Sequence, residues 1–159
     1  MGGETGEDYG ETLANGPIED VITLDDDGPC IAEARHRAAA FLVRVQHDHQ
    51  LVVPARVVAL TQLAVSELVT NARKHAPGPA RLRIRLTGRA VEVTVWDTSP
   101  ALPTARPADP ERVGQHGLEI VTALAQRVEV RQEPPGKSIT AHIGLDPGPE
   151  AELSRTRAV

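Results

Sequence analysis

Residues 55–75 read ARVVALTQLAVSELVTNARKH and form the longest helical pattern in the chain. At about 100° per residue, the apolar side chains of this segment gather on one side of the helix. Next to this core-facing side, a row of side chains along the helix is apolar in its N-terminal half and polar in its C-terminal half. It contains, in order, Leu60, Leu63, Ala64, Glu67, Asn71 and Lys74. A carboxylate, an amide and an ammonium in that place need a cavity, water, a metal or a ligand to satisfy them.

The patterns on either side of this helix predict the remaining elements. In chain order we expect a strand at 17–24, a helix at 31–45, the helix at 55–75, strands at 81–86 and 91–96, a helix at 118–125, and strands at 127–131 and 138–145. Alternation of apolar and polar residues marks the paired strands as half-buried hairpins. Because helices do not alternate with single strands, the sequence favours an α+β fold. The expected form is a two-layer α/β sandwich, with a mostly antiparallel, mixed sheet and helices on one face.

Length and composition indicate one domain with an aliphatic core. The chain has 159 residues, of which 40% are hydrophobic and only 2% aromatic. Residues 1–15 are rich in glycine and acids, so they are predicted to be a disordered tail. Residues 146–159 are polar and are predicted to be a flexible tail. The domain itself is expected to span residues 16–145.

Charge and terminal segments exclude several functional classes. The formal net charge is −5, whereas DNA- and RNA-binding domains need a basic face. Cys30 is the only cysteine, so no internal disulfide can form. Residues 1–10 lack the charged start and apolar run of a signal peptide, and no apolar stretch is long enough to span a bilayer. We therefore expect a cytoplasmic protein whose direct partners are neither nucleic acids nor membranes.

The polar half of the long helix has two interpretations. It is either an ordinary solvated edge near a helix end or one wall of a nucleotide–metal site. In the second interpretation, Asn71 offers a carbonyl oxygen to Mg²⁺ and Lys74 meets a phosphate. Glu67 then polarises a water molecule or a hydroxyl group.

Three later features carry further chemistry. The pentapeptide GQHGL at 114–118 precedes a helical pattern; glycine lets backbone N–H groups approach phosphates, and a helix N-terminus favours anions. Asp97 ends a strand and can accept a hydrogen bond from an amino group such as that of adenine. Thr140 lies in the last predicted strand and indicates a function only in combination with the other two features. Each feature also has an ordinary structural explanation. The glycine segment can be a loop that caps a helix, Asp97 can belong to a turn, and threonine is common in strands.

Together and in order, these motifs resemble the nucleotide-binding boxes of the GHKL ATPases. The resemblance is specifically to the stand-alone anti-sigma-factor serine/threonine kinases of actinobacteria. SELVTNARKHA at 66–76 resembles the asparagine box, VWDTSP at 95–100 the aspartate box, and GQHGLEIV at 114–121 the glycine box. GKSITA at 136–141 resembles the closing motif, and the likeness covers about residues 28–145.

The resemblance implies a role for each matching residue, with ATP and Mg²⁺ as cofactors. Glu67 would be the general base and Asn71 the Mg²⁺ ligand, with Lys74 at the mouth of the site. Asp97 would bond the adenine amino group, supported by Thr140. The nucleotide-binding residues of the glycine box, under a lid formed by residues 97–115, would be Gly114, His116, Gly117 and Leu118.

The implied function is an ATP-dependent protein kinase that phosphorylates a STAS-type anti-sigma antagonist and sequesters a sigma factor. The resemblance also implies a homodimer. The sequence departs from the family at Ser99, which replaces a glycine, at the two residues between Gly114 and Gly117, and in a lid with four prolines. Ser99 and the proline-rich lid favour an alternative, a non-catalytic nucleotide-responsive adaptor that binds a regulatory partner. A third interpretation is the catalytic module of a split sensor kinase.

The neighbours of two further features indicate how these features are to be interpreted. Trp96 is the only tryptophan and adjoins Asp97, so its emission is expected to change when Mg-ATP binds. The segment HDH at 47–49 is not interpreted as a zinc site, because no further Cys or His lies at ligand spacing.

Overall fold

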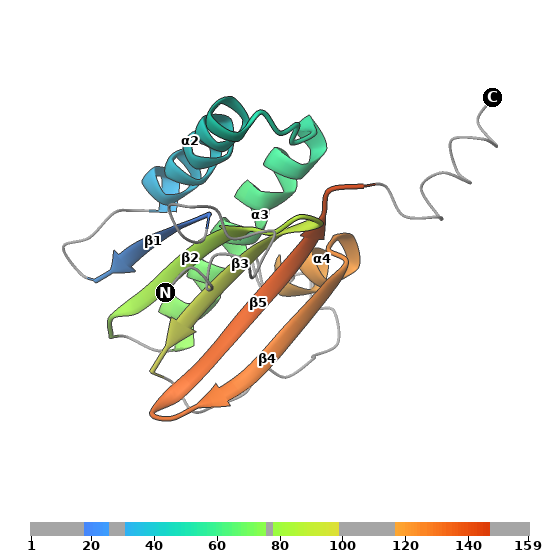
Figure 1. The fold of residues 1–159 in the computed structure, drawn as a ribbon. Coiled ribbons are helices and arrows are strands. Elements are labelled where there is room, and N and C mark those ends of the chain that lie inside the picture. The colour runs from blue at the N-terminus through green and yellow to red at the C-terminus, as the bar shows by residue number, and fades with distance from the viewer. Residues whose placement is uncertain (1–17, 26–30, 76–77, 99–116, 147–159) are drawn as a thin grey trace, which may run out of the picture.

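The structure, a computed structural model, describes residues 18–25, 31–75, 78–98 and 117–146 (Figure 1). Its elements are, in chain order, β1 (Glu19–Leu24), α2 (Ile31–His49), α3 (Ala55–His75), β2 (Ala80–Leu86), β3 (Ala90–Asp97), α4 (Gly117–Leu124), β4 (Arg127–Glu133) and β5 (Gly136–Gly144). Every predicted helix and strand is present. The clearest differences in bounds are at α2, which continues to His49, and at β5, which begins at Gly136.

The five strands form one sheet in the order β1-β2-β3-β5-β4. Every strand pairing described is antiparallel, so this part of the chain does not contain the parallel pair that a mixed sheet requires. The last strand, β5, returns between β3 and β4. Its start therefore lies beside the end of β3, where Asp97 is paired with Lys137.

The helices cover one face of the sheet and form the second layer of the sandwich (Figure 1). α3 packs on β2, β3 and β5, with α2 beside it toward β1 and α4 beside it toward β4. The core between the layers is aliphatic. Alternate strand residues such as Leu82, Val93 and Ile139 are buried in one cluster with Leu68 of α3. The predicted two-layer α/β sandwich is confirmed.

α3 is held by a second helix as well as by the sheet. Gln62 Nε2 donates a hydrogen bond of 3.2 Å to the backbone oxygen of Arg35 in α2. One turn further along α3, the hydroxyl oxygen of Ser66 is buried and has no hydrogen-bond partner among the described residues. Because α3 is fixed on two sides, the side chains of its C-terminal half project in set directions.

The opposite face of the sheet is polar, and none of the three described helices covers it (Figure 1). The guanidinium groups of Arg81 and Arg83 lie over the ring of Trp96, 4.3 and 5.1 Å from its centroid. His142 Nε2 lies 2.9 Å from a carboxylate oxygen of Glu129, and this hydrogen bond holds the pKa of Glu129 below its usual value. Cation–π and hydrogen-bonded contacts thus engage several polar side chains of this outer face, whereas the buried Nε of Arg83 has no hydrogen-bond partner among the described residues.

Gly136 lets the start of β5 come close to the end of β3. A Cβ at this position would meet the backbone carbonyl oxygen of Asp97 and would lie 2.6 Å from the Cα of Thr98. Both obstacles are backbone atoms, which cannot turn aside as the end of a flexible side chain can. A larger residue would therefore force the two strands apart.

Gly136→Ala is expected to lower the free energy of unfolding by about 1–3 kcal/mol, because the added methyl group overpacks this contact. Urea denaturation of the two proteins measures the difference. Gly88→Ala is the matched control. A Cβ on Gly88 has nothing within 4 Å, so its effect should stay within about 0.5 kcal/mol. Equal losses at the two positions would contradict the close approach.

Candidate functional site

The C-terminal half of α3 and the end of β3 lie at the same end of the molecule. A Cβ added to Gly78, shortly after α3, would lie 3.4 Å from the hydroxyl oxygen of Thr98, directly after β3. The chain therefore leaves α3 beside the point where β3 ends. Glu67 and Asn71 on α3 and Asp97 on β3 accordingly belong to one end of the layer between helices and sheet.

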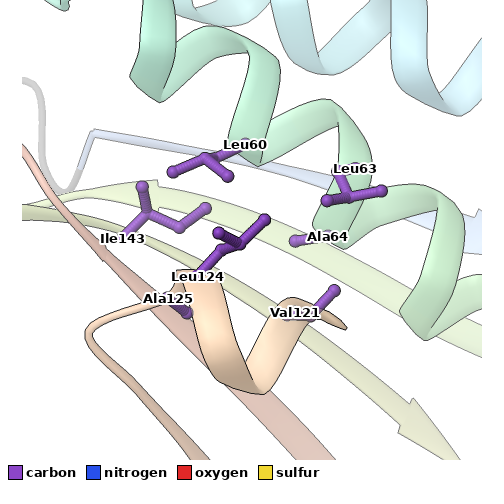
Figure 2. A pocket seen from close by; sticks show the side chains of 7 residues that line it. All are labelled: Leu60, Leu63, Ala64, Val121, Leu124, Ala125 and Ile143. Carbon is purple, nitrogen blue, oxygen red and sulfur yellow. The ribbon is translucent and has the colours of Figure 1, made fainter. Parts of the chain in front are cut away.

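α4 runs antiparallel to α3, as Figure 2 shows. Val121 lies opposite Ala64 of α3, whereas Leu124 lies on the side of Leu60, and all four line one small apolar pocket. Because Leu60 precedes Ala64 and Val121 precedes Leu124, the two helices point in opposite directions. The N-terminus of α4, at Gly117, is therefore directed toward the C-terminal half of α3. The first N–H groups of a helix have no partner within the helix, and together with the helix dipole they favour an anion at that end.

The polar half of the row of side chains along α3 carries a buried group without a partner. Glu67 and Asn71 are half-buried, and Lys74 is exposed. Asn71 Nδ2 is buried and makes no hydrogen bond in the part of the chain that the structure describes. An unsatisfied buried amide costs free energy, and turning the amide over would exchange its nitrogen and oxygen at this position. Asn71 therefore suits an added hydrogen-bonding group or a hard metal ion, for which the amide oxygen is a common ligand.

Asp97 forms a buried ion pair that the sequence analysis missed. Lys137 Nζ lies 3.0 and 3.2 Å from the two carboxylate oxygens of Asp97. The side chains of Lys137 and Asp97 are only 1% and 2% exposed. The signal was present in the sequence, because Lys137 shares its strand face with the apolar Ile139 and Ala141. A lysine in step with core residues indicates a buried cation.

Thr140 does not meet Asp97. It pairs across the sheet with Thr94, and the two hydroxyl oxygens are 2.9 Å apart. Successive side chains of a strand point to opposite faces, so Thr140 and Thr94 lie on the outer face while Asp97 and Lys137 lie on the helix-covered face. The support for an adenine contact that the resemblance implied does not come from Thr140. Lys137 has the place beside Asp97 instead.

Trp96 also lies on the outer face, away from the carboxylate of Asp97. Its indole Nε1 donates a hydrogen bond of 3.0 Å to Glu133, and the hydroxyl of Ser138 donates one of 2.8 Å to the other oxygen of the same carboxylate. The expectation that Trp96 reports directly on a bound nucleotide needs correction, because the sheet separates its ring from Asp97. These contacts instead fasten the β4–β5 turn to the end of β3.

The glycine box lies only partly within the described residues. Gly117 begins α4, and Leu118 packs against the core as a partly buried residue. Leu118 therefore anchors the first turn of α4, whose N-terminus faces the site. Gly114 and His116, together with Ser99 and the prolines of the predicted lid, lie outside the described residues.

Metal binding at this site would depend on few protein ligands. Within the described residues, no group of three or more His, Cys, Asp or Glu could hold a metal ion. The arrangement fits Mg²⁺, which is commonly held by one or two protein oxygens, phosphate oxygens and water.

Among the three described helices, none is long and apolar enough to cross a membrane.

Comparison with known families covers this same part of the chain. Residues 30–143 match the family model described as a histidine kinase-like ATPase domain. The match spans well over half of the 159 residues and includes every candidate site residue from Glu67 to Thr140. A search among curated proteins found no match.

Asp97→Ala is expected to lower the free energy of unfolding by about 3–5 kcal/mol, because it leaves the ammonium of Lys137 buried without its carboxylate. Thermal and urea denaturation measure the loss. Asp20→Ala is the matched control. It removes the carboxylate bound by Arg37, and the side chains of Arg37 and Asp20 are 50% and 16% exposed, so water reaches this pair and the loss should be smaller, about 1 kcal/mol. A loss at Asp97 no larger than at Asp20 would refute the buried pair.

Proposed function

The chain belongs to the family of histidine kinase-like ATPase domains, and from this premise we propose that it is an ATP-dependent protein serine/threonine kinase. The family's domain binds ATP, usually with Mg²⁺. In this proposal the protein phosphorylates a STAS-type anti-sigma antagonist and sequesters a sigma factor. The substrate and client follow from the resemblance of the three nucleotide-binding boxes to those of the stand-alone anti-sigma kinases.

The observation that carries the proposal is the buried, unpartnered amide of Asn71, one helical turn beyond Glu67. A solvated helix edge would leave such an amide in water, where it needs no partner. A buried amide beside a carboxylate, at the end of the helix–sheet layer that also holds Asp97, supports a site for a polar ligand.

The residues of this site fit ATP and its metal. The amide oxygen of Asn71 would hold Mg²⁺, and the exposed ammonium of Lys74 would contact a phosphate at the mouth. The first N–H groups of α4, from Gly117, would bind phosphate oxygens. The carboxylate of Asp97 would accept a hydrogen bond from the adenine amino group. A carboxylate offers about four lone-pair positions, so its pairing with Lys137 is compatible with this bond.

Glu67 would act on the protein substrate. Bound ATP with Mg²⁺ supplies the phosphoryl group. The half-buried carboxylate of Glu67 accepts the proton of the attacking serine hydroxyl and holds that hydroxyl in line. No hydrogen bond or ion pair links Glu67 to another described residue, so its oxygens are available for this purpose. Binding alone would not require a base at this position.

The alternative function is a nucleotide-responsive adaptor that binds its partner without phosphorylating it. Ser99 in the aspartate box and the proline-rich lid favour this alternative.

Glu67→Ala is expected to keep the affinity for Mg-ATP within a few-fold and to lower phosphoryl transfer by about 100-fold or more, because it removes the base but no phosphate contact. The assay incubates each variant with labelled ATP and STAS-domain proteins and measures acid-stable, base-labile label on serine. Transfer at the wild-type rate by Glu67→Ala would show that the assigned base is wrong.

Asn71→Ala is expected to weaken Mg-ATP binding at least tenfold while leaving the weaker binding of metal-free ATP nearly unchanged, because it removes only the metal ligand. Calorimetric titration with and without Mg²⁺ measures both affinities. The wild-type titration also separates the two candidate functions. Binding heat without transfer to any STAS-domain protein would leave the adaptor, and absence of heat would leave a domain that binds no nucleotide.

A further inference from the structure

Lys137 is an unusual cation for this protein. Of the 17 Lys and Arg residues in the chain, only Lys74 and Lys137 are lysines. Lys137 is the largest fully buried side chain in the described part of the molecule. A buried ammonium is costly to desolvate, and an apolar residue of similar length often serves stability as well or better. Burial of this charge therefore calls for an explanation beyond packing.

The hydrogen bonds of Lys137 are incomplete. An ammonium carries three N–H donors. The described bonds of Lys137 both go to the carboxylate of Asp97, and no further acceptor for it is found among the described residues. Across the sheet, Lys137 lies between Asp97 of β3 and the exposed Gln132 of β4, and no side-chain hydrogen bond joins Lys137 to Gln132. The third donor is thus open to an acceptor from a bound ligand.

We propose that Lys137 is a specificity-determining residue that donates a hydrogen bond to N1 of the adenine ring. This inference rests on the proposed function, in which Asp97 accepts a bond from the 6-amino group. On the adenine ring, the acceptor N1 is adjacent to that amino donor. The pair Asp97–Lys137 presents the complementary order, an acceptor beside a donor, with the two groups about 3 Å apart.

The same pair disfavours guanine. With guanine in the same orientation, the carbonyl O6 would face the carboxylate of Asp97 and the N1–H donor would face the ammonium of Lys137. Both contacts would then be repulsive instead of bonding, and the buried polar groups would be left unsatisfied. Lys137 therefore adds a second point of base discrimination to the one at Asp97.

The test compares ATP with 1-deaza-ATP, in which a C–H group replaces N1 and the 6-amino group is kept. Calorimetric titration measures both affinities, with Mg²⁺, for the wild type, Lys137→Met and Lys74→Met. The wild type is expected to bind 1-deaza-ATP about 10- to 100-fold more weakly than ATP, as for loss of a hydrogen bond to a charged donor. In Lys137→Met this ratio should fall to about 1.

The other lysine supplies the matched control. Lys74→Met should weaken both nucleotides by the same factor and keep the wild-type ratio, because Lys74 is placed near the phosphates. Equal affinity of the wild type for ATP and 1-deaza-ATP would overturn the role of Lys137 and leave ATP binding intact. An unchanged ratio in Lys137→Met would overturn it too. A wild type that binds neither nucleotide would refute the proposed function itself, and with it the inference. The wild-type comparison needs no substitution, so equal affinities there would refute the proposal even where a variant fails to fold.

Discussion

The buried ion pair between Asp97 and Lys137 constrains the end of the described domain at which the candidate site lies. Two charges removed from water stabilise each other only while they stay in contact, so the end of β3 and the start of β5 cannot separate without a large cost. The register of the two strands places these residues opposite each other. Gly136 completes the arrangement, because it removes the side chain that would hold the backbones apart.

Contacts on the other face of the sheet hold the same strand ends. The carboxylate of Glu133, at the end of β4, accepts hydrogen bonds from Trp96 in β3 and Ser138 in β5. Three neighbouring strands are thereby tied together one residue away from the buried pair. The end of β3 is therefore fixed from both faces of the sheet. This holds the carboxylate of Asp97 in position beneath the helix layer.

Much of this architecture could be predicted from sequence because the periodic signals were strong. α3 was predicted with its observed bounds, since prolines lie immediately before and shortly after an uninterrupted helical pattern. The family was predicted from short motifs in order, and the match over residues 30–143 agrees with it. The pairing of Asp97 with Lys137 could not be predicted, because it depends on the register between strands that lie 40 residues apart. The same register decided that Thr140 lies on the outer face, where a motif comparison alone had grouped it with Asp97.

The short helix α4 is held by few buried apolar side chains. It has eight residues, and of these Val121 is the one fully buried hydrophobic side chain, while Leu124 and Ile120 are about half exposed. Such an element has little apolar area to hold it against α3, so it belongs to the part of a fold that opens locally at small free-energy cost. An anion bound at its N-terminus would contribute to fastening the helix, and part of the binding free energy would be spent on ordering it. Nucleotide binding and the packing of α4 would then be coupled. The end of the site at Asp97 would stay rigid, whereas the end at the N-terminus of α4 would become more ordered when a nucleotide binds.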